Sequence, residues 1–138
     1  MDIPQEIIEG VIQRGDILLS TFEGIDHQKF FAVMGVSEDR ICGFFFINSN
    51  INRFIYNKPE LLKLQYPMRH QDYDFLRYDS FLCASSVIER SVSSISEEIR
   101  KGTAKIIGRM KEAHIQDVIE MALESEVISK RDKELYFK

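Results

Sequence analysis

A run of seven residues from Ile41 to Ile47 places the strongest constraint on the fold of this chain. Every residue in this run that carries a side chain is apolar. A strand with one face in water alternates apolar and polar residues, so we expect this strand to be covered on both faces. Two strand-like runs precede it, at Ile17–Leu19 and Lys29–Met34, and a polar turn at Ser37–Arg40 separates the second run from the third. The pattern predicts three successive strands, of which the last two form an antiparallel hairpin.

The rest of the chain predicts shorter strands and helices that cap this sheet. A Ser-x-x-Glu pattern at Ser94–Glu97 is typical of a helix start, and Gly102 is a typical helix end. The clearest helix is predicted from Lys111 to Glu124, because apolar residues recur there at helical spacing. The other predicted elements are a short helix opened by Pro4, a short strand or helical turn at Glu60–Leu64, two strands or one bent strand at Ser80–Ala84 and Ser86–Ile88, a strand at Ala104–Ile107, and a helical turn capped by Ser129.

Length and composition indicate one domain that spans residues 1–138, long enough to bury a core without disulfides or metal. The net charge of −4 argues against nucleic-acid binding over a broad surface but leaves room for a local basic groove. Cys42 and Cys83 lie in apolar runs, which favours buried thiols over a disulfide, and no metal-type spacing occurs, so we expect no metal and no cofactor. Neither a signal-peptide pattern nor a membrane-length apolar run occurs, and we expect a cytoplasmic protein with no membrane association.

These patterns together predict an α+β fold. We expect a small, strongly bent antiparallel sheet with capping helices. The surplus of apolar side chains around Phe44–Ile47 also predicts that a second copy covers part of the sheet, which makes a homodimer.

Several pieces of the chain resemble the MazF/PemK family of plasmid-maintenance toxins. The matching pieces are Gly15–Leu19 at the first strand, Lys29–Val33 at the second, Ile47–Ser49 at the end of the third, and Ile106–Met110 before the long helix. The resemblance covers roughly Gly15 to Leu123 in element order. It implies an SH3-like barrel that acts as a metal-independent endoribonuclease toxin, with RNA as substrate and an antitoxin protein as neutralising partner. Members usually carry an Arg-Pro pair at the start of the second strand, where this chain has Lys29-Phe30.

Metal-free RNA cleavage requires a base, an acid and positive charge on the phosphate. Lys29 is the candidate for the charge, His27 for proton transfer near neutral pH, and Ser49 or Asn48 for holding a phosphate oxygen. The connection after residue 50 is locally basic and offers further candidates for RNA binding, namely Arg53, Lys58, Arg69 and His70.

Other interpretations stay open. Lys29 and His27 are also typical of a solvated strand start and an exposed loop, and Asn48 and Ser49 commonly end strands. A catalytically silent barrel that binds a protein, a peptide or nucleic acid is therefore the alternative function. His70, Asp72 and Asp74 alternate along the chain and would share one face of an extended segment, although a polar surface connection explains them equally well. The enzyme hypothesis depends on Lys29, His27 and Ser49 meeting in one concave basic site.

Overall fold

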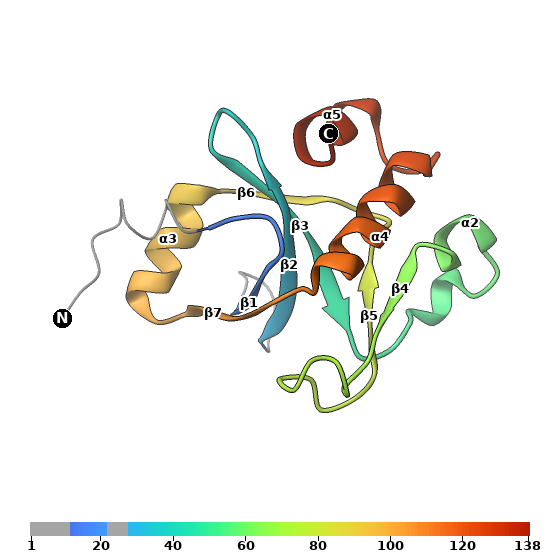
Figure 1. Ribbon diagram of the computed structural model, residues 1–138, viewed down its shortest axis with the longest axis horizontal. Coiled ribbons are helices and arrows are strands. Elements are labelled where there is room, and N and C mark those ends of the chain that lie inside the picture. Colours follow the sequence, from blue (N-terminus) through green and yellow to red (C-terminus); the bar gives the residue numbers. More distant parts are fainter. Residues whose placement is uncertain (1–11, 22–27) are drawn as a thin grey trace.

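The computed structural model describes residues 12–21 and 28–138 (Figure 1). The predicted N-terminal helix falls almost wholly outside these residues, and so does the candidate proton-transfer residue His27. The strands are β1 (Asp16–Ser20), β2 (Lys29–Val36), β3 (Ile41–Asn48), β4 (Gln65–Met68), β5 (Ser80–Cys83), β6 (Ile88–Ser91) and β7 (Ala104–Arg109). The helices are the 3-10 turn η1 (Arg53–Ile55), α2 (Pro59–Leu62), α3 (Val92–Lys101), α4 (Glu112–Glu124) and α5 (Lys130–Tyr136).

Within the described residues the strands form one antiparallel sheet in the order β4-β5-β3-β2-β1-β7. The predicted β2–β3 hairpin is confirmed, with Phe30 opposite Ile47. The other edge of β3 pairs with β6 over Ile41–Phe44 and with β5 over Ile47–Asn48. Two short strands are therefore hydrogen-bonded along the same edge of β3. The predicted α+β class with an antiparallel sheet is confirmed. The end strands β4 and β7 do not pair with each other in the described chain, so the sheet is open and closure into an SH3-like barrel is not confirmed.

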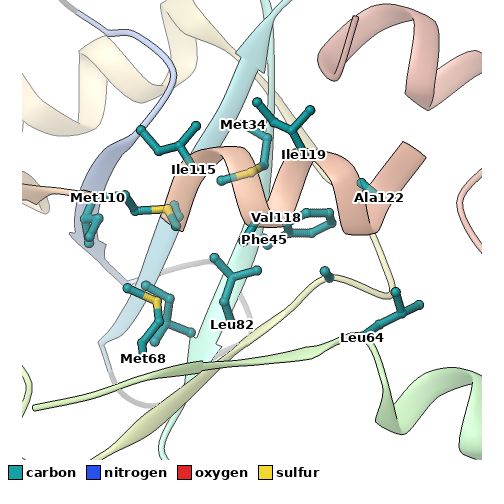
Figure 2. Packing of buried hydrophobic residues seen from close by; sticks show 14 of the residues in the cluster. Met34, Phe45, Leu64, Met68, Leu82, Met110, Ile115, Val118, Ile119 and Ala122 are labelled. Atoms are coloured by element: carbon teal, nitrogen blue, oxygen red, sulfur yellow. The ribbon is translucent and has the colours of Figure 1, made fainter. Parts of the chain in front are cut away.

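Helices cover both faces of the sheet, as the apolar run in β3 predicted. Side chains of β2 and β3 alternate between the faces: Phe45 points toward α4, and Phe44 points toward α3. On the α4 side, Met34 and Phe45 pack with Ile115, Val118 and Ile119 of the helix (Figure 2). On the other side, the α3 residues Val92 and Ile95 complete a smaller core with Leu18, Phe31 and Phe44.

This packing weakens the reason for which the sequence predicted a dimer. Phe44, Phe45 and Ile47 are buried within the single chain, with at most 4% of their surface exposed, whereas Ile41 and Phe46 are half-buried. The apolar run therefore leaves little free surface for a second copy, and the homodimer stays a prediction.

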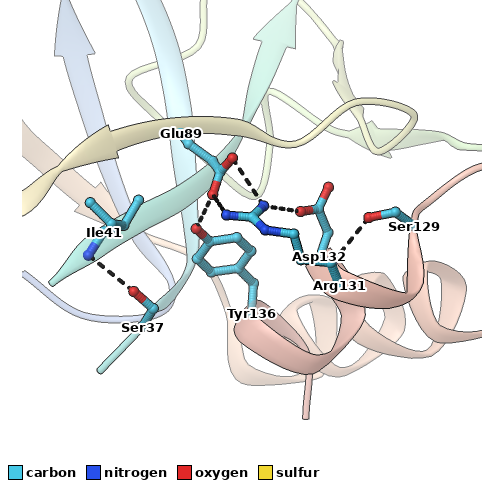
Figure 3. Close-up of polar contacts among 7 residues, drawn as sticks. All are labelled: Ser37, Ile41, Glu89, Ser129, Arg131, Asp132 and Tyr136. Atoms are coloured by element: carbon cyan, nitrogen blue, oxygen red, sulfur yellow. Dashed lines mark hydrogen bonds and ion pairs between the residues drawn. The ribbon is translucent and has the colours of Figure 1, made fainter. Parts of the chain in front are cut away.

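The C-terminal helix α5 is held against the sheet by one buried tyrosine. Gly35 and Gly43 lie close together across the β2–β3 pair, and the Tyr136 ring packs directly on Gly43. The Tyr136 hydroxyl donates to Glu89 on β6, and Arg131 donates to both oxygens of the same carboxylate (Figure 3). These hydrogen bonds, with that from Arg131 first, hold the pKa of Glu89 below its usual value. Two strand glycines thus provide the space in which the C-terminus docks.

Two local predictions are wrong and have physical reasons. The helix predicted to start at Ser94 begins at Val92, because the Ser91 hydroxyl already accepts from the Ser94 N–H and caps the preceding turn. The connection after β3 also contains β4, which the sequence did not predict because Pro67 is unfavourable in a strand. β4 is an edge strand, where a missing N–H is tolerated.

The predicted ends and caps elsewhere agree with the structure. Gly102 ends α3 in a left-handed conformation with a φ of 82°, and Ser129 caps α5 by accepting from the Asp132 N–H. The long helix α4 follows Lys111 and ends at Glu124, as predicted. Throughout the described ranges, no helix combines the length and apolar character needed to cross a membrane.

Candidate functional site

A pocket of about 580 Å³ opens at one end of the sheet. Antiparallel pairing brings three segments together there, because the start of β2 lies beside the end of β3 and the end of β3 lies beside the start of β5. The turn after β3 and the loop before β5 complete the walls. The described residues that line the pocket are Gln28, Lys29, Phe30, Ile47, Asn48, Ser49, Asn50, Asn52, Phe75, Leu76, Arg77, Tyr78 and Ser80.

The lining is cationic in a chain whose net charge is −4. Among the described lining residues, Lys29 and Arg77 are cations and none is an aspartate or glutamate. Three asparagines and two serines add neutral hydrogen-bonding groups, and Phe30, Phe75 and Tyr78 add aromatic surface. The pocket therefore suits a ligand that combines negative charge with flat rings.

Lys29 is positioned by an aromatic neighbour on β3. Its ammonium nitrogen lies 4.7 Å from the centre of the Phe46 ring, within the range of a cation–π interaction. No salt bridge from Lys29 to a carboxylate occurs in the described structure. The charge is thus restrained without being neutralised, and it remains available to an anion.

The opposite wall carries Arg77 and Tyr78, and hydrogen bonds fix its backbone. The Ser80 hydroxyl donates to the Tyr78 carbonyl over 2.9 Å. The His70 Nδ1 lies 2.7 Å from the Leu76 carbonyl, which requires a proton on that nitrogen. Asp79 does not line the pocket, and its carboxylate accepts from the His70 backbone N–H at 2.9 Å. No carboxylate therefore accompanies Arg77 among the described residues of the pocket lining.

The loop that forms this wall, residues 69–79, is anchored to the start of α4. The Tyr73 hydroxyl oxygen accepts from the Lys111 N–H at 3.0 Å and lies 2.7 Å from His114 Nδ1. A backbone N–H can only donate, so the phenol proton is available for His114. Burial raises the pKa of Tyr73, which keeps that proton on the phenol. A salt bridge of 3.0 Å from Lys111 to Asp72 adds a second anchor.

The structure brings some of the predicted site residues together and leaves others outside. Lys29, Asn48 and Ser49 all line the pocket, so two of the three residues whose convergence was predicted, Lys29 and Ser49, lie in one pocket. His27 is outside the described residues. Four candidates do not line the pocket: Arg53, Lys58, Arg69 and His70. Of these, His70 supports the wall through Leu76, and Arg53 directly follows the lining residue Asn52.

Arg77 is the main functional candidate that the sequence did not reveal. It stands alone between Leu76 and Tyr78, so local charge clustering does not single it out. Only the pairing of β5 with the end of β3 places it opposite Lys29 and Asn48. The available signal was an Arg-Tyr pair separated from the start of β5 by Asp79 alone, and it points to the pocket only once the strand that pairs with β5 is known.

Metal binding finds no support in the described part of the chain. No group of three His, Cys, Asp or Glu side chains there is arranged to hold a metal ion. The alternating set His70, Asp72 and Asp74 does not form a site, since Asp72 pairs with Lys111 and His70 bonds the Leu76 carbonyl. Both cysteines are free thiols; Cys42 is buried as predicted, whereas Cys83 is only half-buried.

A second groove, of about 400 Å³, has the opposite electrostatic character. It lies between α4 and the segment around β4, and its described lining has three carboxylates against one cation. The charged residues are Asp117, Glu120, Glu124 and Lys63. The Tyr66 hydroxyl donates to Asp117 over 2.7 Å. An anionic ligand is thus favoured at the first pocket and opposed at the second.

The chain matches no protein-family model, and no curated protein matches it. The fold defines the class as an open antiparallel α+β domain with a cation-lined pocket at one end of the sheet. The functional interpretation therefore depends on this pocket and on its chemistry.

Proposed function

We propose that the pocket at the end of the β2–β3 hairpin binds single-stranded RNA. The observation that carries the proposal is the composition of the lining as far as the structure describes it, with two cations, three asparagines, three aromatic rings and no carboxylate among these residues. Phosphates of a strand would pair with Lys29 and Arg77, and bases would pack on the rings and bond the amides. Duplex RNA fits less well, because its bases are already stacked and paired.

Fluorescence anisotropy with a fluorescein-labelled nine-nucleotide oligouridylate, in the presence of EDTA, tests this proposal. Wild-type protein should bind, and Lys29→Ala and Arg77→Ala should each weaken binding. Each should also reduce the slope of log affinity against log salt by about 0.7, the value for one phosphate contact on a single strand. Lys130→Ala is the matched control, because it removes a cation far from the pocket. Lys130 belongs to α5, which packs on Gly35, and Gly35 lies about 20 Å along β2 from Lys29. Absence of binding at low salt, or an equal loss in the control, would refute the proposal.

RNA cleavage without metal is the second candidate, and the presence of Lys29 and Ser49 in one pocket favours it. In this reaction the 2′-hydroxyl attacks the adjacent phosphorus and the bond to the 5′ oxygen breaks, giving a 2′,3′-cyclic phosphate and a 5′-hydroxyl. One proton leaves the 2′-hydroxyl and one is delivered to the departing oxygen. Lys29 would stabilise the charge that develops on the phosphate, and Ser49 would donate to one of its oxygens. His27 is the proposed base.

Incubation of the purified protein with a long unstructured RNA in EDTA tests cleavage. Lys29→Ala should abolish it, whereas Lys29→Arg should retain or raise it, because a guanidinium fits a phosphate with two hydrogen bonds. His27→Ala should slow cleavage by roughly a hundredfold if His27 is the base. RNA that stays intact with wild-type protein would retire the enzyme hypothesis and leave the silent RNA-binding alternative.

The resemblance to MazF/PemK toxins extends this second candidate to a biological role. We propose an endoribonuclease toxin with an SH3-like arrangement of strands, a homodimer that an antitoxin protein neutralises. Induction in a bacterial host should then arrest growth, and the Lys29→Ala variant should be harmless. Light scattering at high micromolar concentration should give the mass of two chains, and a monomer there would contradict the dimer.

A further inference from the structure

The segment that leaves the pocket after β3 exposes two aromatic rings to solvent. Phe54 is 74% exposed and Tyr56 is 62% exposed. Burying a large aromatic ring is favourable, so two such rings left in water one residue apart require an explanation beyond folding. Neither ring is part of the hydrophobic core, since both are exposed and η1 contributes no buried residue.

This exposed segment is continuous with the pocket. Asn52 lines the pocket, and its side-chain oxygen accepts from the Phe54 N–H at 2.9 Å, which caps the turn η1. The backbone that presents the two rings is therefore tied to the pocket wall, since η1 lies between β3 and α2 in the chain. An RNA strand that leaves the pocket along this wall would pass from Asn52 to Phe54.

The charge of the segment favours an anionic ligand. Residues 48–58 contain two cations, Arg53 and Lys58, and four asparagines but no aspartate or glutamate. The Arg53 guanidinium carbon lies 5.9 Å from the centre of the Phe54 ring. Both cations are exposed, and neither forms a salt bridge in the described structure. Exposed rings beside free cations and amides are the features with which proteins bind single-stranded nucleic acids.

We propose that Phe54 and Tyr56 stack bases of the RNA strand outside the pocket, while Arg53 and Lys58 contact its phosphates. This inference rests on the proposed RNA-binding function and narrows its substrate. The site takes a single-stranded segment of several nucleotides, longer than the pocket itself holds. A free nucleotide or a short oligonucleotide would use only the pocket.

Two labelled RNAs separate the pocket from this extension: an oligouridylate of three nucleotides and one of nine. Phe54→Ala and Tyr56→Ala should each weaken binding of the nine-nucleotide RNA by about 5- to 150-fold, the effect of removing one stacked base. Both should leave binding of the three-nucleotide RNA unchanged. Phe54→Leu should behave like Phe54→Ala, because leucine keeps the apolar surface but has no flat ring. Val127→Ala, at another exposed apolar residue, is the control and should bind both RNAs as wild type does.

A direct spectroscopic readout is available because the chain contains no tryptophan. Phe54→Trp and Tyr56→Trp each introduce a single indole whose emission should be quenched when the nine-nucleotide RNA is added. Val127→Trp should keep its emission unchanged.

The outcomes distinguish this inference from the function on which it rests. If neither RNA binds wild-type protein, the RNA-binding proposal itself fails. If both RNAs bind but Phe54→Ala and Tyr56→Ala leave the nine-nucleotide affinity unchanged, the extension is wrong and the pocket stands. Retained RNA affinity in Phe54→Leu would also overturn it, because leucine has no flat ring on which a base could stack.

Discussion

Gly43→Ala should destabilise the protein because an added methyl group would collide with the Tyr136 ring. The new Cβ would lie 2.6 Å from Tyr136 Cγ and 2.7 Å from both Cδ atoms, whereas carbon atoms pack best at about 3.5–4.0 Å. The ring has little freedom to move away, since Tyr136 is fully buried, its hydroxyl donates to Glu89, and its carbonyl accepts from Arg14 at 2.8 Å. Overpacking of this kind costs about 1–3 kcal/mol. Restriction of the unfolded chain offsets up to about 1 kcal/mol of that cost.

A double-mutant cycle identifies the ring as the cause. Tyr136→Ala alone should cost about 3–5 kcal/mol, the usual cost of removing a buried aromatic ring. In the Tyr136→Ala background the Cγ and Cδ atoms are absent, so Gly43→Ala should cost nothing or should stabilise slightly. The coupling between the two substitutions should therefore be at least about 1 kcal/mol, measured by urea unfolding at pH 7.

Gly35→Ala is the matched control for this cycle. Its Cβ would lie 2.7 Å from the Tyr136 carbonyl oxygen and 3.0 Å from Tyr136 Cα, which are backbone atoms that Tyr136→Ala retains. Gly35→Ala should therefore stay destabilising in both backgrounds. Additive effects of Gly43→Ala and Tyr136→Ala within about 0.5 kcal/mol would refute the reasoning. If Tyr136→Ala also removed the cost of Gly35→Ala, the whole of α5 would have detached from the sheet.

Two further predictions concern the core and the contact between β6 and α5. Ile119→Ala should lower the free energy of unfolding by about 2–5 kcal/mol, because Ile119 is buried between α4 and the sheet. A loss below about 0.5 kcal/mol would mean that its contacts contribute little. The pKa of Glu89 is lowered in the folded protein, so its charged form adds stability above the ordinary pKa of 4.5, and that stability is lost as the pH falls through the folded value. Glu89→Gln should therefore cost up to about 1 kcal/mol at pH 7, as expected for a partly exposed pair, and less at pH 3. An equal cost at both pH values would contradict this assignment.

Local patterns predicted the central elements because they report which faces of each strand are buried. The apolar run in β3 required cover on both faces, and α3 and α4 provide it. The spacing of Ile115, Val118 and Ile119 likewise predicted the buried stripe of α4. In contrast, β4 contains Pro67 and depends on its pairing with β5 for its strand conformation, which local patterns do not report.

The candidate site was predictable only in part, for a similar reason. Lys29, Asn48 and Ser49 lie at strand ends that a hairpin brings together, so their proximity follows from local patterns and the hairpin alone. Arg77 reaches the same pocket through the pairing of β3 with β5, across a connection of more than thirty residues. That pairing depends on the tertiary packing of the whole sheet.

Photo-crosslinking tests most directly whether RNA binds in this pocket. Wild-type protein would be irradiated with a nine-nucleotide RNA that contains 4-thiouridine, digested, and analysed by mass spectrometry. We expect crosslinks at the aromatic residues of the pocket, Phe30, Phe75 and Tyr78, and we expect Lys29→Ala to diminish them. Crosslinks confined to other surfaces, such as the acidic groove beside α4, or an absence of crosslinks at low salt, would contradict the proposed RNA site.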